Sequence, residues 1–154
     1  MSVPDSRIHV AVGAEVLDLG AISARVVHPG AGALATFVGT VRDRHAGKPV
    51  AYLEYEAYGP MAVRTLRQIA TEAAARWDLL GVAIEHRVGR LEIGEASVGI
   101  AVAAAHRGES FGALRFVIDE LKLRVPIWKR ETGPDGTFWI EGPELIEAAT
   151  DDNG

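Results

Sequence analysis

The chain of 154 residues contains no cysteine. This absence excludes disulfides, metal sites built from thiolates and any reaction that carries sulfur on a cysteine of the chain. The sequence also lacks an apolar run of the ~18 residues that a membrane-spanning helix needs. Its first residues, MSVPDSRIHV, lack the basic and apolar regions of a signal peptide. We therefore expect a cytoplasmic protein.

Positively charged residues are missing from the last part of the chain. From Glu131 to Gly154 there are seven acidic residues and no lysine or arginine. The formal net charge of the whole chain is -5, which argues against non-specific binding to nucleic acid. No repeat or linker divides the sequence, so we expect one domain over residues 1–142 and a frayed acidic tail over 143–154.

Hydrophobic periodicity predicts strands and helices in mixed order, which favours an α+β or α/β class. The expected strands are SRIHVAV, ALATFVGTV (buried), AYLEYEAY (half-buried), VAIEHRVG, ASVGIAVAAA and TFWIEG. One helix is expected from Gly59 to about Trp77 and a second over about 110–123, ended by Pro126. The expected buried stripes are Met61, Leu66, Ile69, Ala73 and Trp77 on the first helix, and Phe111, Leu114, Ile118 and Leu121 on the second.

Two short glycine motifs suggest activities that their context does not support. GAGALA at 30–35 matches a dinucleotide-binding pattern, but it leads into a strand, whereas that pattern must open a helix. GESFG at 108–112 matches a nucleophile elbow, but every histidine precedes Ser110 in the chain, opposite to the order of that fold. A serine hydrolase that uses Ser110 and His106 remains an alternative, and helix capping is the simpler role for Ser110.

The five histidines show no spacing typical of metal ligands, so we expect no metal site. His86 lies in a strand pattern and His45 in a polar loop. Most histidines in such places are only solvated.

The stretch ELKLRVPIWKRE contains four basic residues around one proline: Lys122, Arg124, Lys129 and Arg130. From Arg107 to Arg130 there are six basic residues against three acidic ones. Lys122 is expected in the last turn of its helix, where a cation suits the helix dipole. If Arg42 and His106-Arg107 reach the same region from the ends of their strands, the cations form a pocket for a phosphate or carboxylate. The alternative is that Lys122 is a solvated lysine paired with Asp119.

Four segments resemble the large, catalytic subunit of molybdopterin synthase. They are ATFVGTVRDR, LEYEAYGPMA, HRVGRLEIGEASVGIAVAAAHR and FVIDELKLRVPIWKRE, which together extend from about residue 30 to about 142. The resemblance implies an α+β fold with a hammerhead-type subdomain, a single catalytic domain and no cofactor or metal. It implies sulfurtransferase activity that converts cyclic pyranopterin monophosphate to molybdopterin in molybdenum cofactor biosynthesis.

The resemblance also implies partners and site residues. The sulfur comes from the C-terminal thiocarboxylate of a small ubiquitin-like subunit, and two large subunits form the central homodimer of a heterotetramer. Lys122 and Lys129 match the catalytic lysines of the family. The residues that match its substrate-binding positions are Thr40, Val41, Arg42, His106, Arg107, Arg130 and Glu131. A non-catalytic adaptor that only holds a ubiquitin-like tail remains a further alternative.

Overall fold

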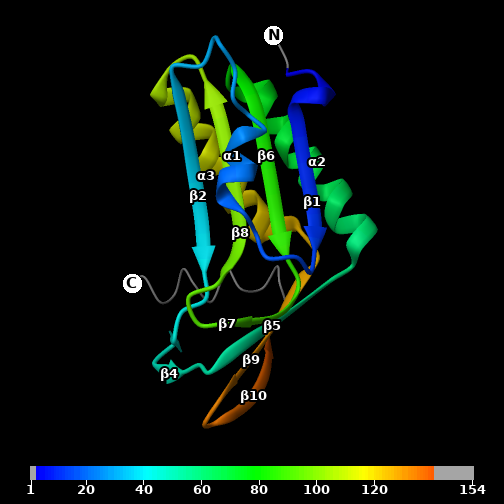
Figure 1. Cartoon of the computed structure of the whole chain (residues 1–154). Coiled ribbons are helices and arrows are strands. Elements are labelled where there is room, and N and C mark those ends of the chain that lie inside the picture. The colour runs from blue at the N-terminus through cyan, green and yellow to red at the C-terminus, as the bar shows by residue number, and fades with distance from the viewer. Residues whose placement is uncertain (1–2, 141–154) are drawn as a thin grey trace.

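The computed structural model describes residues 3–140 (Figure 1). The expected acidic tail over 143–154 and the last two residues of the expected domain lie outside this range. The strands are β1 Ile8–Gly13, β2 Ala33–Thr40, β3 Arg44–His45, β4 Lys48–Pro49, β5 Tyr52–Ala57, β6 Leu79–Arg87, β7 Gly89–Glu92, β8 Ala96–Ala104, β9 Ile127–Gly133 and β10 Gly136–Ile140. The helices are α1 Leu19–Ala24, α2 Gly59–Arg76 and α3 Arg107–Arg124, and a short 3₁₀ turn, Asp5–Arg7, precedes β1.

The larger sheet has the strand order β1-β6-β8-β2, with β1 and β6 parallel and the other pairs antiparallel. Side chains alternate across it because successive residues of a strand point to opposite faces. Val98, Ile100 and Val102 of β8 join the main core with α2 and α3, whereas Ala101 and Ala103 join a smaller core with α1. Figure 1 shows α1 on one face of this sheet and α2 and α3 on the other. The ALATFVGTV segment forms β2 as expected, but it is an edge strand in which only Ala35 is buried, so the expectation of a buried strand is wrong.

Helix α2 has the predicted bounds, with Pro60 in its first turn, where a missing N–H costs nothing. Leu66, Ile69 and Ala73 are fully buried, as the periodicity predicts. Met61 is instead 46% exposed, and the neighbouring Ala62 is buried in its place. Within the first turn, the small residue is therefore the one that packs against the core.

Helix α3 begins three residues before its expected start and presents a different face. Its fully buried positions are Ser110, Ala113, Val117 and Leu121, whereas Phe111 is 62% exposed. Leu114 and Ile118 are only partly buried against the core. The expected stripe is thus displaced, because small residues at 110 and 113 face the sheet and Phe111 points away from it.

Arg124 ties the end of α3 to α2. Its guanidinium donates two hydrogen bonds of 2.8 Å to the Glu72 carboxylate and one of 3.1 Å to Glu120. We expect Arg124→Ala to lower the free energy of unfolding by about 1 kcal/mol, since a bidentate pair in a network exceeds an isolated surface pair. Urea unfolding should show this loss. Arg115→Ala, which removes only the exposed pair with Asp119, should show no measurable change, and equal effects of the two variants would contradict the prediction.

The smaller sheet has the order β10-β9-β5-β7 and is antiparallel throughout. Its core is formed by Val41, Val50, Leu53 and Leu91, so the half-buried character expected of AYLEYEAY is confirmed. The polar loop after β2 contains the small hairpin β3–β4, which turns at Ala46 and Gly47, both with positive φ. Mixed sheets with three helices confirm the α+β class. Within residues 3–140, the helices are too short or too polar to cross a membrane.

Candidate functional site

A pocket lies where the two sheets meet the end of α3. Residues at the end of β2 and β6 and at the start of β8 line it from the larger sheet, and residues of β5 and β9 line it from the smaller sheet. Figure 1 shows why these segments meet, since β2 and β6 run towards the smaller sheet and β8 runs away from it. The pocket is thus built from segments that are far apart in the sequence.

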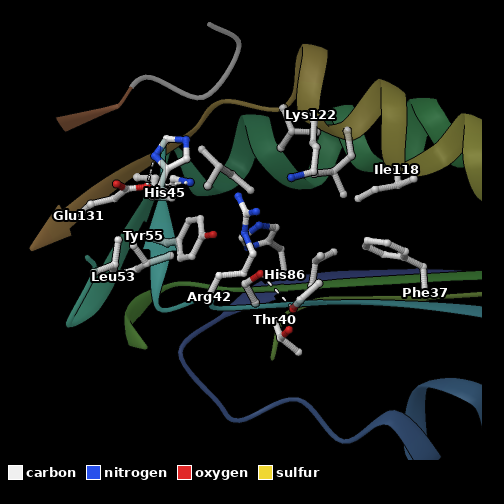
Figure 2. Close-up of a pocket in the computed structure, with 18 of the residues that line it drawn as sticks. Phe37, Thr40, Arg42, His45, Leu53, Tyr55, His86, Ile118, Lys122 and Glu131 are labelled. Atoms are coloured by element: carbon white, nitrogen blue, oxygen red, sulfur yellow. Dashed lines mark hydrogen bonds and ion pairs between the residues drawn. The ribbon is translucent and has the colours of Figure 1, made fainter. Parts of the chain in front are cut away.

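Three cations predicted to converge do line this pocket: Arg42, Lys122 and Lys129. Lys122 is on an exposed turn of α3, but its amine points into the pocket (Figure 2). Burial lowers the pKa of this amine, and the charges of Lys129 and Arg42 lower it further. Within residues 3–140 Lys122 has no hydrogen-bond or ion-pair partner, so the expected alternative of a pair with Asp119 is wrong. Asp119 pairs with Arg115 instead.

Lys129 and Glu131 face the pocket together because they are two residues apart on β9. The Lys129 ammonium lies 3.2 Å from a carboxylate oxygen of Glu131, and Nδ1 of His45 lies 2.8 Å from the same oxygen. Glu131 is only 8% exposed. A buried carboxylate therefore holds one catalytic candidate on one side and the β3–β4 hairpin on the other.

Arg130 belongs to the opposite face of β9 and does not line the pocket. Its guanidinium pairs with Glu54 of β5 and lies over the Trp139 ring, 4.9 Å from the ring centre. The structure thus separates Arg130 from its two neighbours in sequence, although Lys129 was predicted as a catalytic residue and Arg130 and Glu131 as substrate-binding residues of the same site. The reason is the alternation of side chains along a strand.

His106 and Arg107 are at the other end of β8 from the pocket. They line a separate shallow hollow with Gly32, next to the first turn of α3. Because a strand rises by about 3.3 Å per residue, the nine residues of β8 place them roughly 30 Å from its start. Within one chain they therefore do not reach the pocket that the other cations line.

Comparison with known proteins identifies relatives of this chain in sequence and in fold. The family model described as MoaE protein matches residues 12–124. The chain belongs to the MoaE protein family. A molybdopterin synthase catalytic subunit from Arabidopsis thaliana is 50% identical over 119 residues, which are 77% of this chain and 60% of the relative.

A second relative with the same description comes from Halalkalibacterium halodurans. It is 51% identical over 116 residues, which are 75% of this chain and 74% of the relative. The crystal structure of molybdopterin synthase from Staphylococcus aureus aligns with a TM-score of 0.80 and 36% identity, covering 84% of this chain and 94% of that chain. These similarities confirm the resemblance and the fold class that the sequence suggested, and they agree with the expected role in molybdopterin biosynthesis.

The two residues before Arg42 that were also predicted to bind substrate differ in their surroundings. Thr40 lines the pocket at the end of β2. Val41 is 3% exposed and belongs to the core of the smaller sheet. Its backbone N–H donates to Glu95 and its carbonyl accepts from Gly94. Val41 thus fixes the path of the chain between the sheets, and Arg42 after it turns into the pocket.

Ser110 is neither a helix cap nor an exposed nucleophile. The cap position of α3 is His106, and Ser110 is in the first turn with 1% exposure. Its hydroxyl donates a 3.0 Å hydrogen bond to the Arg107 carbonyl. The imidazole of His106 is next to Glu109 instead, at 3.6 Å. A serine hydrolase using Ser110 is thus contradicted by the burial of the hydroxyl.

The pocket floor contains polar residues that the sequence did not single out. His86 is 5% exposed, and its ring meets the Tyr55 ring edge-on with 5.1 Å between the centres. Burial raises the pKa of Tyr55. His86 was expected to be solvated, but it continues the row of Val82 and Ile84 on the core face of β6. The spacing of two residues from Val82 and Ile84 is the sequence pattern that could have predicted the burial of His86. For His45 the sequence carried no signal, because its partner Glu131 is distant in the chain.

Burial lowers the pKa of His86 to about 4, against an opposing hydrogen bond to the Arg87 carbonyl, and the charge of Lys122 lowers it further. The unfolded chain therefore binds this proton more readily. Stability should be unaffected by His86 above pH ~6.5 and should fall as the pH drops towards 4. Between pH 7 and pH 4.5 the loss from this group is expected to be about 2–3 kcal/mol.

The free energy of unfolding of wild type and of His86→Gln is measured with urea at the two pH values. The contribution of His86 is the amount by which the wild type loses more stability than the variant. Carboxylates also titrate in this range, so the variant serves as the baseline. Equal losses in the two proteins would show that His86 is protonated as easily in the folded state as in the unfolded one.

Proposed function

We propose that this chain is the catalytic, large subunit of a molybdopterin synthase in the cytoplasm. It converts cyclic pyranopterin monophosphate to molybdopterin, with sulfur delivered on the C-terminal thiocarboxylate of a small ubiquitin-like subunit. The observation that carries the proposal is the convergence of Arg42, Lys122 and Lys129 on one pocket in a chain of the MoaE family. The chain has no cysteine, so a sulfur atom has to arrive on a partner.

The chemistry requires fixed positive charge. The dithiolene takes one sulfur from each of two thiocarboxylates, and water cleaves each acyl–sulfur bond, which returns the partner's tail as a carboxylate. In the step that needs the cations, a thiocarboxylate sulfur attacks a side-chain carbon of the pterin, a carbon–sulfur bond forms, and the cyclic phosphate opens with its electron pair on the leaving oxygen. Cations held around that oxygen lower the barrier because they are already oriented when the charge develops. Arg42 suits the phosphate, since a guanidinium offers a planar fork of donors.

Lys122 is the residue we assign to proton transfer or nucleophilic attack. Burial and two neighbouring cations lower the pKa of its amine. A lowered pKa makes its ammonium a stronger proton donor and a larger fraction of its amine a nucleophile. Lys129, which is paired with Glu131, is assigned to anchoring the carboxyl end of the partner's tail or the phosphate.

His106 and Arg107 fit this function only if they act in the pocket of a second copy. A central homodimer with a small subunit at each end, forming a heterotetramer, supplies such a copy. The exposed position of both residues at the far end of β8 supports this arrangement, because side chains exposed on one chain are free to meet another. In a twofold dimer each chain would lend the pair to its partner.

Mixing two inactive variants tests the exchange. In a mixed dimer of Lys122→Ala and Arg107→Ala chains, one site would carry both substitutions and the other site would carry neither. Random assortment makes about half of the dimers mixed, so about a quarter of wild-type activity should return. Subunits must be exchanged by co-expression or by dilution and reassembly. An equal mixture that stays as inactive as the separate variants would mean that no site combines Lys122 of one chain with Arg107 of the other, and would contradict the exchange.

Reconstitution tests the function itself. The full chain is mixed with a thiocarboxylated small subunit and cyclic pyranopterin monophosphate, and molybdopterin is measured as its oxidised fluorescent derivative. Product from wild type and from Ser110→Ala is expected. A stable complex with the small subunit but no product would support the adaptor, and reaction of Ser110 with a fluorophosphonate probe would revive the hydrolase.

A further inference from the structure

The pocket contains a donor and an acceptor that are complementary and both lack a partner. Lys122 has no hydrogen bond or ion pair within residues 3–140. His86 uses only Nδ1, which lies 2.8 Å from the backbone carbonyl of Arg87. A carbonyl oxygen only accepts hydrogen bonds, so Nδ1 carries the proton and donates it there. In the neutral ring, Nε2 is then left with a lone pair and no partner in the described chain.

The His86 ring cannot turn away from the pocket freely. It is 5% exposed, it lies edge-on against Tyr55, and its backbone is in the register His86–Val98 between β6 and β8. Both His86 and Lys122 line the same pocket, from the larger sheet and from α3 respectively (Figure 2). Nε2 is therefore a fixed acceptor, and the Lys122 amine in the same pocket is on a long flexible side chain.

A neutral acceptor differs from a carboxylate in its effect on a lysine. A carboxylate would hold the amine in its charged form, because an opposite charge favours ionisation. Within residues 3–140, Glu131 is the one carboxylate that lines the pocket, and it is already shared by Lys129 and His45. The pocket thus offers Lys122 an imidazole in place of a carboxylate.

We propose that His86 is a positioning residue for Lys122: its Nε2 accepts a hydrogen bond from the amine and directs it into the pocket while leaving it free to lose its proton. This inference rests on the proposed function for the role of Lys122, but the contact itself does not depend on any activity. Burial and the nearby charge of Lys122 keep the imidazole neutral, which is the state that accepts.

Other charged and titratable groups also surround His86 and are held constant in the test. On the pocket side these are Arg42, Arg44, His45, Tyr55, Lys129 and Glu131, and in the hollow behind it they are Glu15 and Glu85. The variants below leave all of them in place.

An NMR titration of the histidine ring protons tests the contact without substrate, with the His86 signal assigned by its loss in His86→Gln. In Lys122→Met the ammonium is gone, so the pKa of His86 should shift upward from its wild-type value. Arg115→Met, on the same helix but outside the pocket, should leave it unchanged. An unchanged His86 titration in Lys122→Met would overturn the proposal.

Kinetics of the reconstituted reaction test the consequence. His86→Gln keeps an acceptor near the position of Nε2, and its kcat should stay within about threefold of wild type. His86→Leu removes the acceptor, and kcat should fall by about tenfold or more with little change in KM, because the loss concerns orientation of a reacting group. Equal kcat values for the two variants, whether high or low, would overturn the proposal.

The two arms separate the possible failures. If His86→Leu does not fold, as judged by its thermal unfolding, the titration with Lys122→Met still decides whether the residues interact. If wild type forms no product, the proposed function fails, and the titration again decides the contact. An interaction seen by NMR together with normal turnover of a folded His86→Leu would limit His86 to a structural role and overturn the positioning.

Discussion

Lys122→Ala is expected to lower the rate of molybdopterin formation by about 100-fold or more, because proton transfer by a positioned side chain contributes that much. The fold should survive, since Lys122 is on an exposed turn of α3 and makes no ion pair within residues 3–140. Its amine points into the pocket (Figure 2), where burial lowers its pKa and the charges of Lys129 and Arg42 lower it further. The loss should therefore appear in kcat, with the complex with the small subunit still formed.

Lys122→Arg distinguishes charge from proton transfer. An arginine stays protonated at any working pH, so it restores the positive charge but neither donates a proton readily nor attacks as an amine. We expect it to be nearly as impaired as Lys122→Ala, whereas Arg115→Ala should react like wild type. Single-turnover fluorescence of the oxidised product measures all three rates. A folded Lys122→Ala that binds the small subunit and turns over near-normally would remove Lys122 from the chemistry.

Glu131→Ala is expected to destabilise the protein by about 2–3 kcal/mol and to abolish most activity. The carboxylate is 8% exposed and is shared by Lys129 and His45. Its removal leaves buried polar groups without a partner, which costs more than the pair contributed. The cost should fall below the roughly 3–5 kcal/mol of fully buried pairs, because the Lys129 side chain is 16% exposed.

The consequence extends to the β3–β4 hairpin, which loses its tie to β9. Urea unfolding gives the stability term, and Glu131→Gln shows how much a neutral acceptor restores. Glu92→Ala is the matched control, because it removes a glutamate from an exposed surface pair with Arg90 and should have no measurable effect. If Glu131→Ala unfolds at the same urea concentration as wild type, the shared carboxylate does not stabilise the pocket.

The sequence predicts the helices and strands better than it predicts which side chains they bury. The bounds of α2 follow from Pro60 and the apolar spacing, and they are correct. On α3 the hydrophobic residue Phe111 is exposed while Ser110 is buried. Periodicity identifies an apolar stripe along the helix. Close packing of the helix against the sheet then favours small residues at the contact, and the local sequence pattern does not show where that contact lies.

The site was predictable only where residues stand at the ends of elements on the same side. Arg42 follows β2, Lys122 is in the last turn of α3 and Lys129 is near the start of β9, and these converge. His106 follows β8, which runs in the opposite direction to β2, so the same reasoning fails there. Strand direction within a sheet is set by long-range pairing and is not written in the local pattern.

The side chains that β9 presents to the pocket depend on the number of residues between Pro126 and Lys129, because alternate residues of a strand face opposite sides. Lys129 and Glu131 face inward, and Arg130 between them faces Glu54 and Trp139. Inserting or deleting one residue between Pro126 and Lys129 would exchange the faces. The pocket would then gain an arginine and lose its lysine and carboxylate together. Inserting or deleting two residues would return Lys129 and Glu131 to the pocket face. Length changes before Lys129 are therefore expected to preserve the pocket only when they involve an even number of residues.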